Sequence, residues 1–126
     1  MTKSDKFSPL GERGLLIYHN PRCRKSREGL EILKNSGKEF EIIKYLEVVP
    51  SEKELTEIIH ILGISPIQLV RKNEKIWKDN FKGKELSDAE IIKAMIENPK
   101  LIERPIIINN NRGVIGRPPE TILEII

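Results

Sequence analysis

The first part of the chain predicts a strand, a helix and a second strand in direct succession. Leu15-Leu16-Ile17-Tyr18 is a short apolar run typical of a buried strand, and residues 40–46 form a second apolar segment. Between them, a helical pattern follows the turn at Pro21 and ends at Gly37. Two strands joined in this way lie parallel in one sheet, with a right-handed crossover through the helix.

The middle of the chain predicts helices, and its end predicts a β-hairpin. Three segments begin with a serine cap, at Ser51, Ser65 and Ser87, and a Glu or Gln three residues later completes a capping box. "RPIIIN" and "GVIG" have the pattern of two strands joined by the Asn-rich turn "NNNR", and "RPPETILEII" predicts a closing helix. The order β-α-β-α, helical insertion, β-β-α predicts an α/β protein with the mixed β-sheet of a thioredoxin-like fold.

The N-terminal segment, the length of the apolar runs and the net charge limit the kinds of protein that this chain could be. Residues 1–14, "MTKSDKFSPLGERG", lack the apolar centre of a secretion signal, so we expect a flexible leader before a single domain at 15–126. No apolar run approaches the roughly 20 residues that cross a bilayer, so we expect no membrane contact. The net charge is +3, but the charges mostly alternate in sign, which does not indicate a nucleic-acid surface. We expect a cytoplasmic monomer without a bound cofactor or metal.

Cys23 is the only cysteine, and it lies among four cations in "YHNPRCRKSRE". The predicted helix begins here, and the free N–H groups and dipole of a helix N-terminus favour negative charge, as do nearby cations. Both effects lower the pKa of a thiol and increase its nucleophilic thiolate form. The alternative is an inert, buried thiol, but its charged neighbours are poor core residues. We therefore expect this stretch at the surface and Cys23 as a reactive group.

Two neighbours bear on this cysteine. His19 stands four residues earlier, and Ser26, three residues later, could donate a hydrogen bond to the sulfur. Ser26 also occupies the place of the second cysteine in a C-x-x-C motif. Any redox cycle at Cys23 would therefore need a thiol from outside the chain.

Five segments together resemble the glutaredoxin-dependent arsenate reductase (ArsC) family: "IYHNPRCRKSRE", "SGKEFEIIKYLE", "LGISPIQLVRKNE", "NPKLIERPIIINN" and "IGRPPE". The resemblance runs from about Leu15 to the C-terminus and is strongest to an uncharacterised bacterial sister branch of that family. It implies a thioredoxin-like domain that reduces arsenate to arsenite, with Cys23 as the nucleophile. Glutathione would be a co-substrate, and glutaredoxin would remove the mixed disulfide.

The resemblance also implies which residues bind the substrate. Arg71 of "LVRKNE", Arg104 of "ERPI" and Arg117 of "GRPPE" would hold the oxyanion, for which planar guanidinium groups are well suited. His19 of "YHNP" would help to lower the pKa of the cysteine, and Arg104-Pro105 would be a cis peptide bond. The chain departs from the best-known reductases at Arg24-Lys25, where those enzymes carry small residues. This departure could change anion binding or the docking of the thiol partner.

Two other functions stay open from the sequence. The fold is shared with Spx-type transcription regulators that bind the α subunit of RNA polymerase, although their redox switch usually has a second cysteine where Ser26 stands. A glutathione-dependent thiol oxidoreductase with another substrate would keep the same cysteine chemistry.

Overall fold

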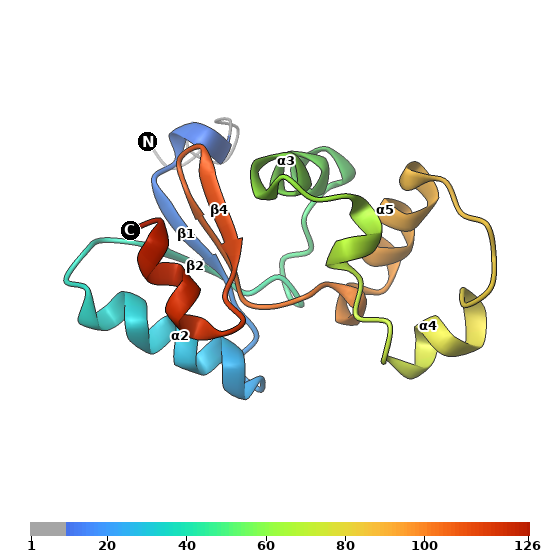
Figure 1. The fold of residues 1–126 in the computed structure, drawn as a ribbon, viewed down its shortest axis with the longest axis horizontal. Coiled ribbons are helices and arrows are strands. Elements are labelled where there is room, and N and C mark those ends of the chain that lie inside the picture. The colour runs from blue at the N-terminus through green and yellow to red at the C-terminus, as the bar shows by residue number, and fades with distance from the viewer. Residues whose placement is uncertain (1–9) are drawn as a thin grey trace.

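The computed structural model describes residues 10–126, in which a four-stranded mixed sheet is covered by helices (Figure 1). The strands are β1 (Leu15–Tyr18), β2 (Glu41–Ile43), β3 (Ile106–Asn109) and β4 (Arg112–Ile115), arranged in the order β2-β1-β3-β4. β1 pairs with β2 in parallel, and β3 pairs antiparallel with both β1 and β4. The predicted parallel pair and the predicted hairpin are both confirmed.

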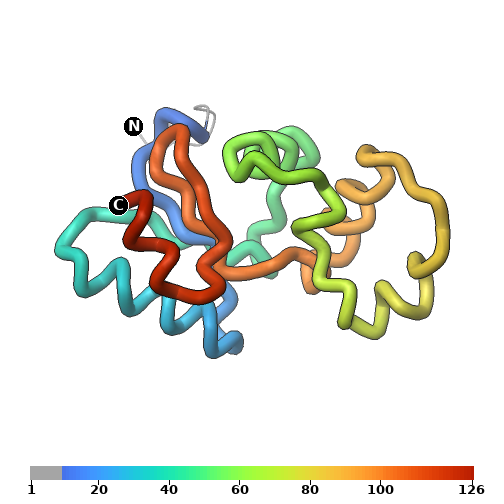
Figure 2. The backbone as a smooth tube through the Cα atoms, in the orientation of Figure 1, coloured from blue at the N-terminus to red at the C-terminus, as the bar shows by residue number. Residues whose placement is uncertain are grey.

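The helices divide the chain into a sheet half and a helical half. α2 (Arg24–Asn35) joins β1 to β2, while α3 (Glu52–Leu62), α4 (Lys75–Asn80) and α5 (Asp88–Glu97) lie between β2 and β3. Figure 2 shows this helical insertion beside the sheet, with an extended segment returning the chain to β3. This order confirms the predicted thioredoxin-like α/β fold. No helix within residues 10–126 is both long and apolar enough to cross a membrane.

Four short 3-10 helices complete the fold: η1 (Leu10–Glu12), η2 (Pro66–Leu69), η3 (Pro99–Leu101) and η4 (Pro119–Glu124). Two predicted helices differ from the structure, one in length and one in type. The segment capped by Ser65 forms only η2, and the closing segment forms the 3-10 helix η4 in place of an α-helix. The strand expected at residues 40–46 is regular only over β2.

The sheet carries apolar side chains on both faces because successive residues of a strand point to opposite sides. Leu15 and Ile17 of β1 pack with α2 and η4, in a core that includes Leu33 and Ile122. Leu16 and Tyr18 face the other side and join the larger core built with α3, α5 and the end of the insertion. The strand at the centre is therefore buried on both faces, which holds its carboxyl end in a fixed position.

The helix starts predicted at Ser51, Ser65 and Ser87 are confirmed, and the capping box is complete at Ser65 and Ser87 but has only one of its two bonds at Ser51. The Ser51 hydroxyl accepts a hydrogen bond from the backbone N–H of Glu54 at 3.0 Å. At Ser87, the hydroxyl accepts from the N–H of Glu90 at 3.2 Å, and the Glu90 carboxylate accepts from the N–H of Ser87 at 2.8 Å. Each bond pairs an N–H group that a helix N-terminus leaves free.

The predicted leader at residues 1–14 needs a correction in its second part. Residues 1–9 lie outside the described residues. Leu10, however, is only 2% exposed and packs in the larger core, and its N–H donates to the Glu57 carboxylate at 3.4 Å. The N–H of Gly14 donates to the Asn110 side chain at 3.2 Å. Residues 10–14 therefore belong to the folded domain, because Leu10 buries an apolar side chain there.

Candidate active site

Cys23 is the N-cap residue of α2 and lies directly after the turn that follows β1. Its N–H donates to the carbonyl of Asn20 at 3.0 Å, and its own carbonyl accepts from the N–H of Arg27 at 3.0 Å. The turn therefore closes at Cys23, and the helix begins at the next residue. This position places the thiol beside the free N–H groups of the helix N-terminus.

Burial and positive charge act on the thiol in opposite directions. Burial raises the pKa of Cys23, but hydrogen bonding and charge from Arg104 lower it, as do the backbone N–H groups of Ser26 and Lys25. The net effect is a pKa below the ordinary thiol value, so the thiolate is favoured. The expected activation of Cys23 by a helix N-terminus and by cations therefore has a structural basis.

The thiol is more covered than its neighbours in the sequence suggest. Cys23 is 9% exposed, while Pro21, Arg22 and Arg24 around it are exposed, as expected for a surface stretch. Two arginine side chains from the end of the chain approach the sulfur. The thiol is therefore buried beneath charged side chains, and it belongs to neither of the two apolar core clusters.

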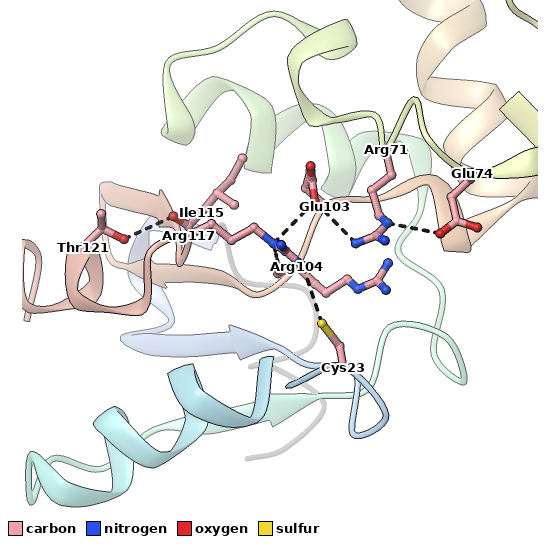
Figure 3. Close-up of polar contacts among 8 residues, drawn as sticks. All are labelled: Cys23, Arg71, Glu74, Glu103, Arg104, Ile115, Arg117 and Thr121. Atoms are coloured by element: carbon pink, nitrogen blue, oxygen red, sulfur yellow. Dashed lines mark hydrogen bonds and ion pairs between the residues drawn. The ribbon is translucent and has the colours of Figure 1, made fainter. Parts of the chain in front are cut away.

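Arg117 makes the direct contact with the sulfur, as Figure 3 shows. Its Nη2 lies 3.7 Å from Sγ of Cys23, and its Nε donates to the backbone carbonyl of Arg104 at 2.8 Å. The segment after β4 holds Arg117 in place, since the N–H of Gly116 donates to the carbonyl of Pro105 at 2.8 Å. One guanidinium thus connects the hairpin end of the fold with the first helix.

Arg104 lies between Cys23 and Arg71 in Figure 3 and immediately precedes Pro105. The Arg104-Pro105 peptide bond is cis, as predicted, and the Arg117-Pro118 bond is cis as well. The Nε atom of Arg104 is buried and has no hydrogen-bond partner within residues 10–126. An unpaired, buried N–H donor on a cation is suited to bind an anion.

Arg71 reaches the same site from the helical insertion. Its N–H donates to the carbonyl of Leu101 at 2.7 Å, next to an isolated antiparallel bridge between Val70 and Ile102. Its side chain forms ion pairs with Glu74, at 3.3 Å, and with Glu103, at 3.7 Å. The three arginines that the resemblance implied are therefore brought together around the thiol from three separate parts of the chain.

Glu103 is a site residue that the sequence analysis did not identify. Its Oε1 lies 3.7 Å from Nη1 of Arg71 and 3.7 Å from Nε of Arg117, and this oxygen is buried without a hydrogen bond to any of residues 10–126. The only indication in the sequence is that it adjoins Arg104 in "ERPI". A Glu beside an Arg is otherwise typical of an exposed charge pair.

Tyr45 is a second residue that the sequence analysis missed. Its side chain is 1% exposed, and its hydroxyl makes no hydrogen bond with the residues that the structure describes. Burial raises the pKa of Tyr45, and the nearby charge of Arg104 and the Asn20 side chain lower it in part. The hydroxyl therefore lies within reach of the charges at the site. Its place in "KYLE", within the second predicted strand, gave no functional indication.

His19 and Ser26 form a buried pair beneath the thiol. Nδ1 of His19 lies 2.6 Å from the Ser26 hydroxyl, which also accepts from the N–H of Asn20 at 3.0 Å. The predicted donation from the Ser26 hydroxyl to the sulfur is replaced by these contacts, and the Ser26 backbone N–H acts on the thiol instead. The sequence could not show this, because the Ser26 side chain points toward the loop before Cys23.

Burial, together with the charge of Lys44, lowers the pKa of His19 despite its bond to Ser26. The imidazole is therefore mostly neutral near pH 7. A neutral ring supplies no positive charge to the thiol. The geometry supports a positioning role for His19, in which it orders Ser26 and the loop before the helix.

The departure at Arg24-Lys25 lies on the outer face of α2. The exposed side chains of Arg24 and Lys25 pair with Glu28 at 3.3 and 3.6 Å. Neither side chain is directed to the sulfur by these contacts. Within residues 10–126, no group of His, Cys, Asp and Glu side chains is arranged to hold a metal ion. The chemistry of the site is that of a nucleophilic thiolate under a cluster of guanidinium groups.

Comparison with known proteins identifies the family of this chain. The ArsC family model matches residues 18–125. A protein of Escherichia coli named "Uncharacterized protein YfgD" is 47% identical over 87% of this chain and 94% of its own length. The arsenate reductase of Haemophilus influenzae is 46% identical, over 89% of this chain and 98% of its own length.

A solved structure is similar to this chain over nearly its whole length. The structure of the arsenate reductase from Vibrio cholerae superposes with a TM-score of 0.85 at 46% identity, covering 89% of this chain and 97% of that one. The residues that the family model matches, 18–125, include Cys23 and the three arginines. On these grounds, the chain belongs to the ArsC family.

Proposed function

We propose that this protein reduces arsenate to arsenite, with Cys23 as the nucleophile. The observation that carries the proposal is the contact of Arg117 with the Cys23 sulfur at 3.7 Å, at a helix N-terminus where Arg71 and Arg104 also converge. A thiolate surrounded by guanidinium groups is suited to an oxyanion substrate whose central atom it attacks. Relatives at 46% and 40% identity that are named arsenate reductase support this choice.

In the first step, the Cys23 thiolate attacks arsenic. A sulfur–arsenic bond forms and one arsenic–oxygen bond breaks, and the oxygen leaves as water after it takes up protons. Arg71, Arg104 and Arg117 would bind the remaining oxygens and stabilise the charge that develops on them. Arsenic is still in its oxidised state at this point, so two electrons have to follow.

External thiols would supply those electrons, since Cys23 is the only cysteine. Glutathione would bind to arsenic and displace a second oxygen as water. A glutaredoxin thiol would then attack the glutathione sulfur, so that a mixed disulfide forms and the electron pair of the arsenic–sulfur bond stays on arsenic. Hydrolysis of the Cys23–arsenic bond releases arsenite. In total, two thiols become one disulfide, arsenic gains two electrons, and one oxygen leaves as water.

A coupled assay tests this proposal. Purified protein, glutathione, glutaredoxin, glutathione reductase and NADPH are mixed, and NADPH oxidation is followed after arsenate is added. We expect arsenate-dependent turnover that Cys23→Ser abolishes. Arg117→Gln should reduce this turnover. Arg24→Gln is its matched control, because Arg24 is an exposed arginine paired with Glu28. Turnover equal in the protein and in Cys23→Ser would refute the proposal.

The same assay separates the third possibility that the sequence left open. Turnover without arsenate, on a disulfide substrate and dependent on Cys23, would favour a general thiol oxidoreductase. The expectations of a cytoplasmic location, a monomer and no nucleic-acid partner stay predictions. The convergence of three arginines on the thiol supports the reductase over a transcription regulator, because an oxyanion accounts for all of them.

A further inference from the structure

The carboxylate of Glu103 lies inside the cluster of arginines that would bind the oxyanion. Its Oε1 is 3.7 Å from Arg71 and 3.7 Å from Arg117, shielded from solvent, and without a hydrogen-bond donor in the described part of the chain. A negative group at this place is unexpected, because it repels the anion that the arginines attract. Its position therefore needs a reason.

The backbone fixes this carboxylate at the site. The N–H of Glu103 donates to the carbonyl of Leu69 at 2.9 Å, and the N–H of Arg71 donates to the carbonyl of Leu101 at 2.7 Å. The bridge between Val70 and Ile102 lies between these two bonds. Glu103 and Arg71 thus stand on two short segments that are paired with each other, and the Glu103 side chain is directed into the site by the fold.

The surroundings of Oε1 neutralise its charge but leave its lone pairs free. At 3.7 Å, both guanidinium contacts are longer than a hydrogen bond. Nε of Arg117, the atom of that residue near Oε1, directs its hydrogen to the carbonyl of Arg104 at 2.8 Å. Arg71 approaches Oε1 through Nη1 and donates from Nε to Glu74 at 3.3 Å. Oε1 therefore remains an acceptor that lacks a donor among residues 10–126, and a ligand that brings an O–H group would supply one.

Oxyanions differ in whether they carry an O–H group that could donate to Oε1. Near neutral pH, arsenate and phosphate retain at least one proton on an oxygen, whereas sulfate retains none. Arg117 contacts both the Cys23 sulfur and the Glu103 carboxylate, so an oxyanion held above the thiol lies next to Oε1. A protonated oxyanion can donate its O–H to Glu103, while sulfate would place an unprotonated oxygen against the carboxylate.

We propose that Glu103 is a specificity-determining residue that selects oxyanions carrying a proton and rejects sulfate. The inference rests on the proposed function only in placing an oxyanion at Arg71, Arg104 and Arg117. The site distinguishes the two kinds of oxyanion because Oε1 is a buried acceptor. An oxyanion without a proton leaves Oε1 unpaired and is repelled by its charge, so that oxyanion binds more weakly. The carboxylate weakens the binding of every anion, but it weakens the binding of sulfate most.

The test uses phosphate and sulfate, which the thiol does not reduce, so that binding is measured apart from catalysis. Dissociation constants are obtained by titration calorimetry near neutral pH, and independently from protection of Cys23 against iodoacetamide. We expect the protein to prefer phosphate over sulfate, and Glu103→Gln to reduce that preference by about tenfold or more. In Glu103→Gln, sulfate should bind more tightly, because the Gln amide can donate to it.

Glu74→Gln is the matched control. Glu74 is the other carboxylate paired with Arg71, so its replacement also removes one negative charge near the site. We expect tighter binding of both anions in Glu74→Gln, with an unchanged ratio. An unchanged ratio in Glu103→Gln, or an equal change in both variants, would overturn the inference, as would a protein that binds neither anion. A phosphate preference that depends on Glu103 in a protein without arsenate turnover would overturn only the proposed function.

Discussion

Nη2 of Arg117 lies 3.7 Å from Sγ of Cys23, although the two residues are 94 positions apart in the sequence. This contact joins the hairpin end of the chain to the first helix, and it exists because β3 pairs with β1 in the centre of the sheet. Arg117 also donates to the backbone carbonyl of Arg104 at 2.8 Å. Its guanidinium is therefore held over the thiol before any ligand arrives.

Arg117→Gln tests this pre-organised contact. We expect kcat/KM for arsenate to fall by about 10²-fold, the cost of removing one donor directed at a developing oxyanion. The rate of Cys23 alkylation near neutral pH should fall as well, because a cation beside the thiolate is lost. Arg24→Gln should leave both quantities close to those of the unchanged protein. Equal effects of the two substitutions would contradict a specific role for Arg117.

The reactivity of Cys23 with iodoacetamide should show a lowered pKa. Burial raises this pKa, but Arg104 and the N–H groups of the helix N-terminus outweigh burial and lower it. The alkylation rate, measured from about pH 5 to about pH 10, should have its inflection below the ordinary value of about 8.5. Arg104→Gln should move the inflection upward. An inflection at or above the ordinary value in the unchanged protein would refute an activated thiol.

The lowered pKa of Cys23 should also make the unfolding free energy depend on pH. Because the pKa of Cys23 is lower in the folded protein than in the unfolded chain, the thiolate stabilises the fold at pH values above the unfolded pKa. That stabilisation is lost as the pH falls through the folded pKa. The difference in unfolding free energy between the protein and Cys23→Ser, from urea titrations, should therefore increase with pH across this range. A constant difference would argue against the shift.

The fold was largely predictable because its local features agree with its tertiary structure. The serine caps at Ser51 and Ser87 determine helix starts from neighbouring residues alone. The ends of elements were less predictable, because distant contacts determine them. Val70 leaves the helical conformation to pair with Ile102, which limits the segment after Ser65 to a single 3-10 helix.

The site was predictable in part. A thiol at a helix start among cations could be deduced from "HNPRCRKSR", since the helix N-terminus is a local feature. The convergence of Arg71, Arg104 and Arg117 depends on strand pairing and on the bridge at Val70, so only the family resemblance indicated it. Glu103 was missed because sequence spacing does not show that one Glu lies between two distant arginines.

Ser26→Ala tests the buried pair beneath the thiol. Ser26 is fully buried, and its hydroxyl pairs with the His19 ring at 2.6 Å and with the N–H of Asn20 at 3.0 Å. Its removal leaves two buried polar groups without a partner, so we expect a loss of about 1–3 kcal/mol in unfolding free energy. The pKa of Cys23 should change little, because alanine keeps the backbone N–H that acts on the sulfur. A large upward shift in the alkylation profile would instead assign the hydroxyl to the thiolate.

Because of His19, we expect the unfolding free energy of the protein to depend on pH in the mildly acidic range. Burial lowers its pKa in the folded state from the ordinary value of 6.5, so the fold favours the neutral ring. The associated stabilisation is complete above pH 6.5 and is lost as the pH falls from there toward the folded pKa. Urea titrations at several pH values should show this loss, and His19→Gln should reduce it. An NMR titration of the His19 ring with a pKa above 6.5 would contradict the prediction.

Leu10→Ala tests whether the domain begins before the first strand. Leu10 is 2% exposed and packs in the core formed with α3, and its N–H donates to Glu57 at 3.4 Å. Truncation of a buried leucine leaves a cavity, so we expect a loss of about 2 kcal/mol or more in unfolding free energy. Leu123→Ala is the matched control, because Leu123 is 61% exposed and its truncation should cost no more than about 0.5 kcal/mol. If the two variants unfold at the same urea concentration, residues 10–14 contribute no stability, and the domain begins at β1 as the sequence suggested.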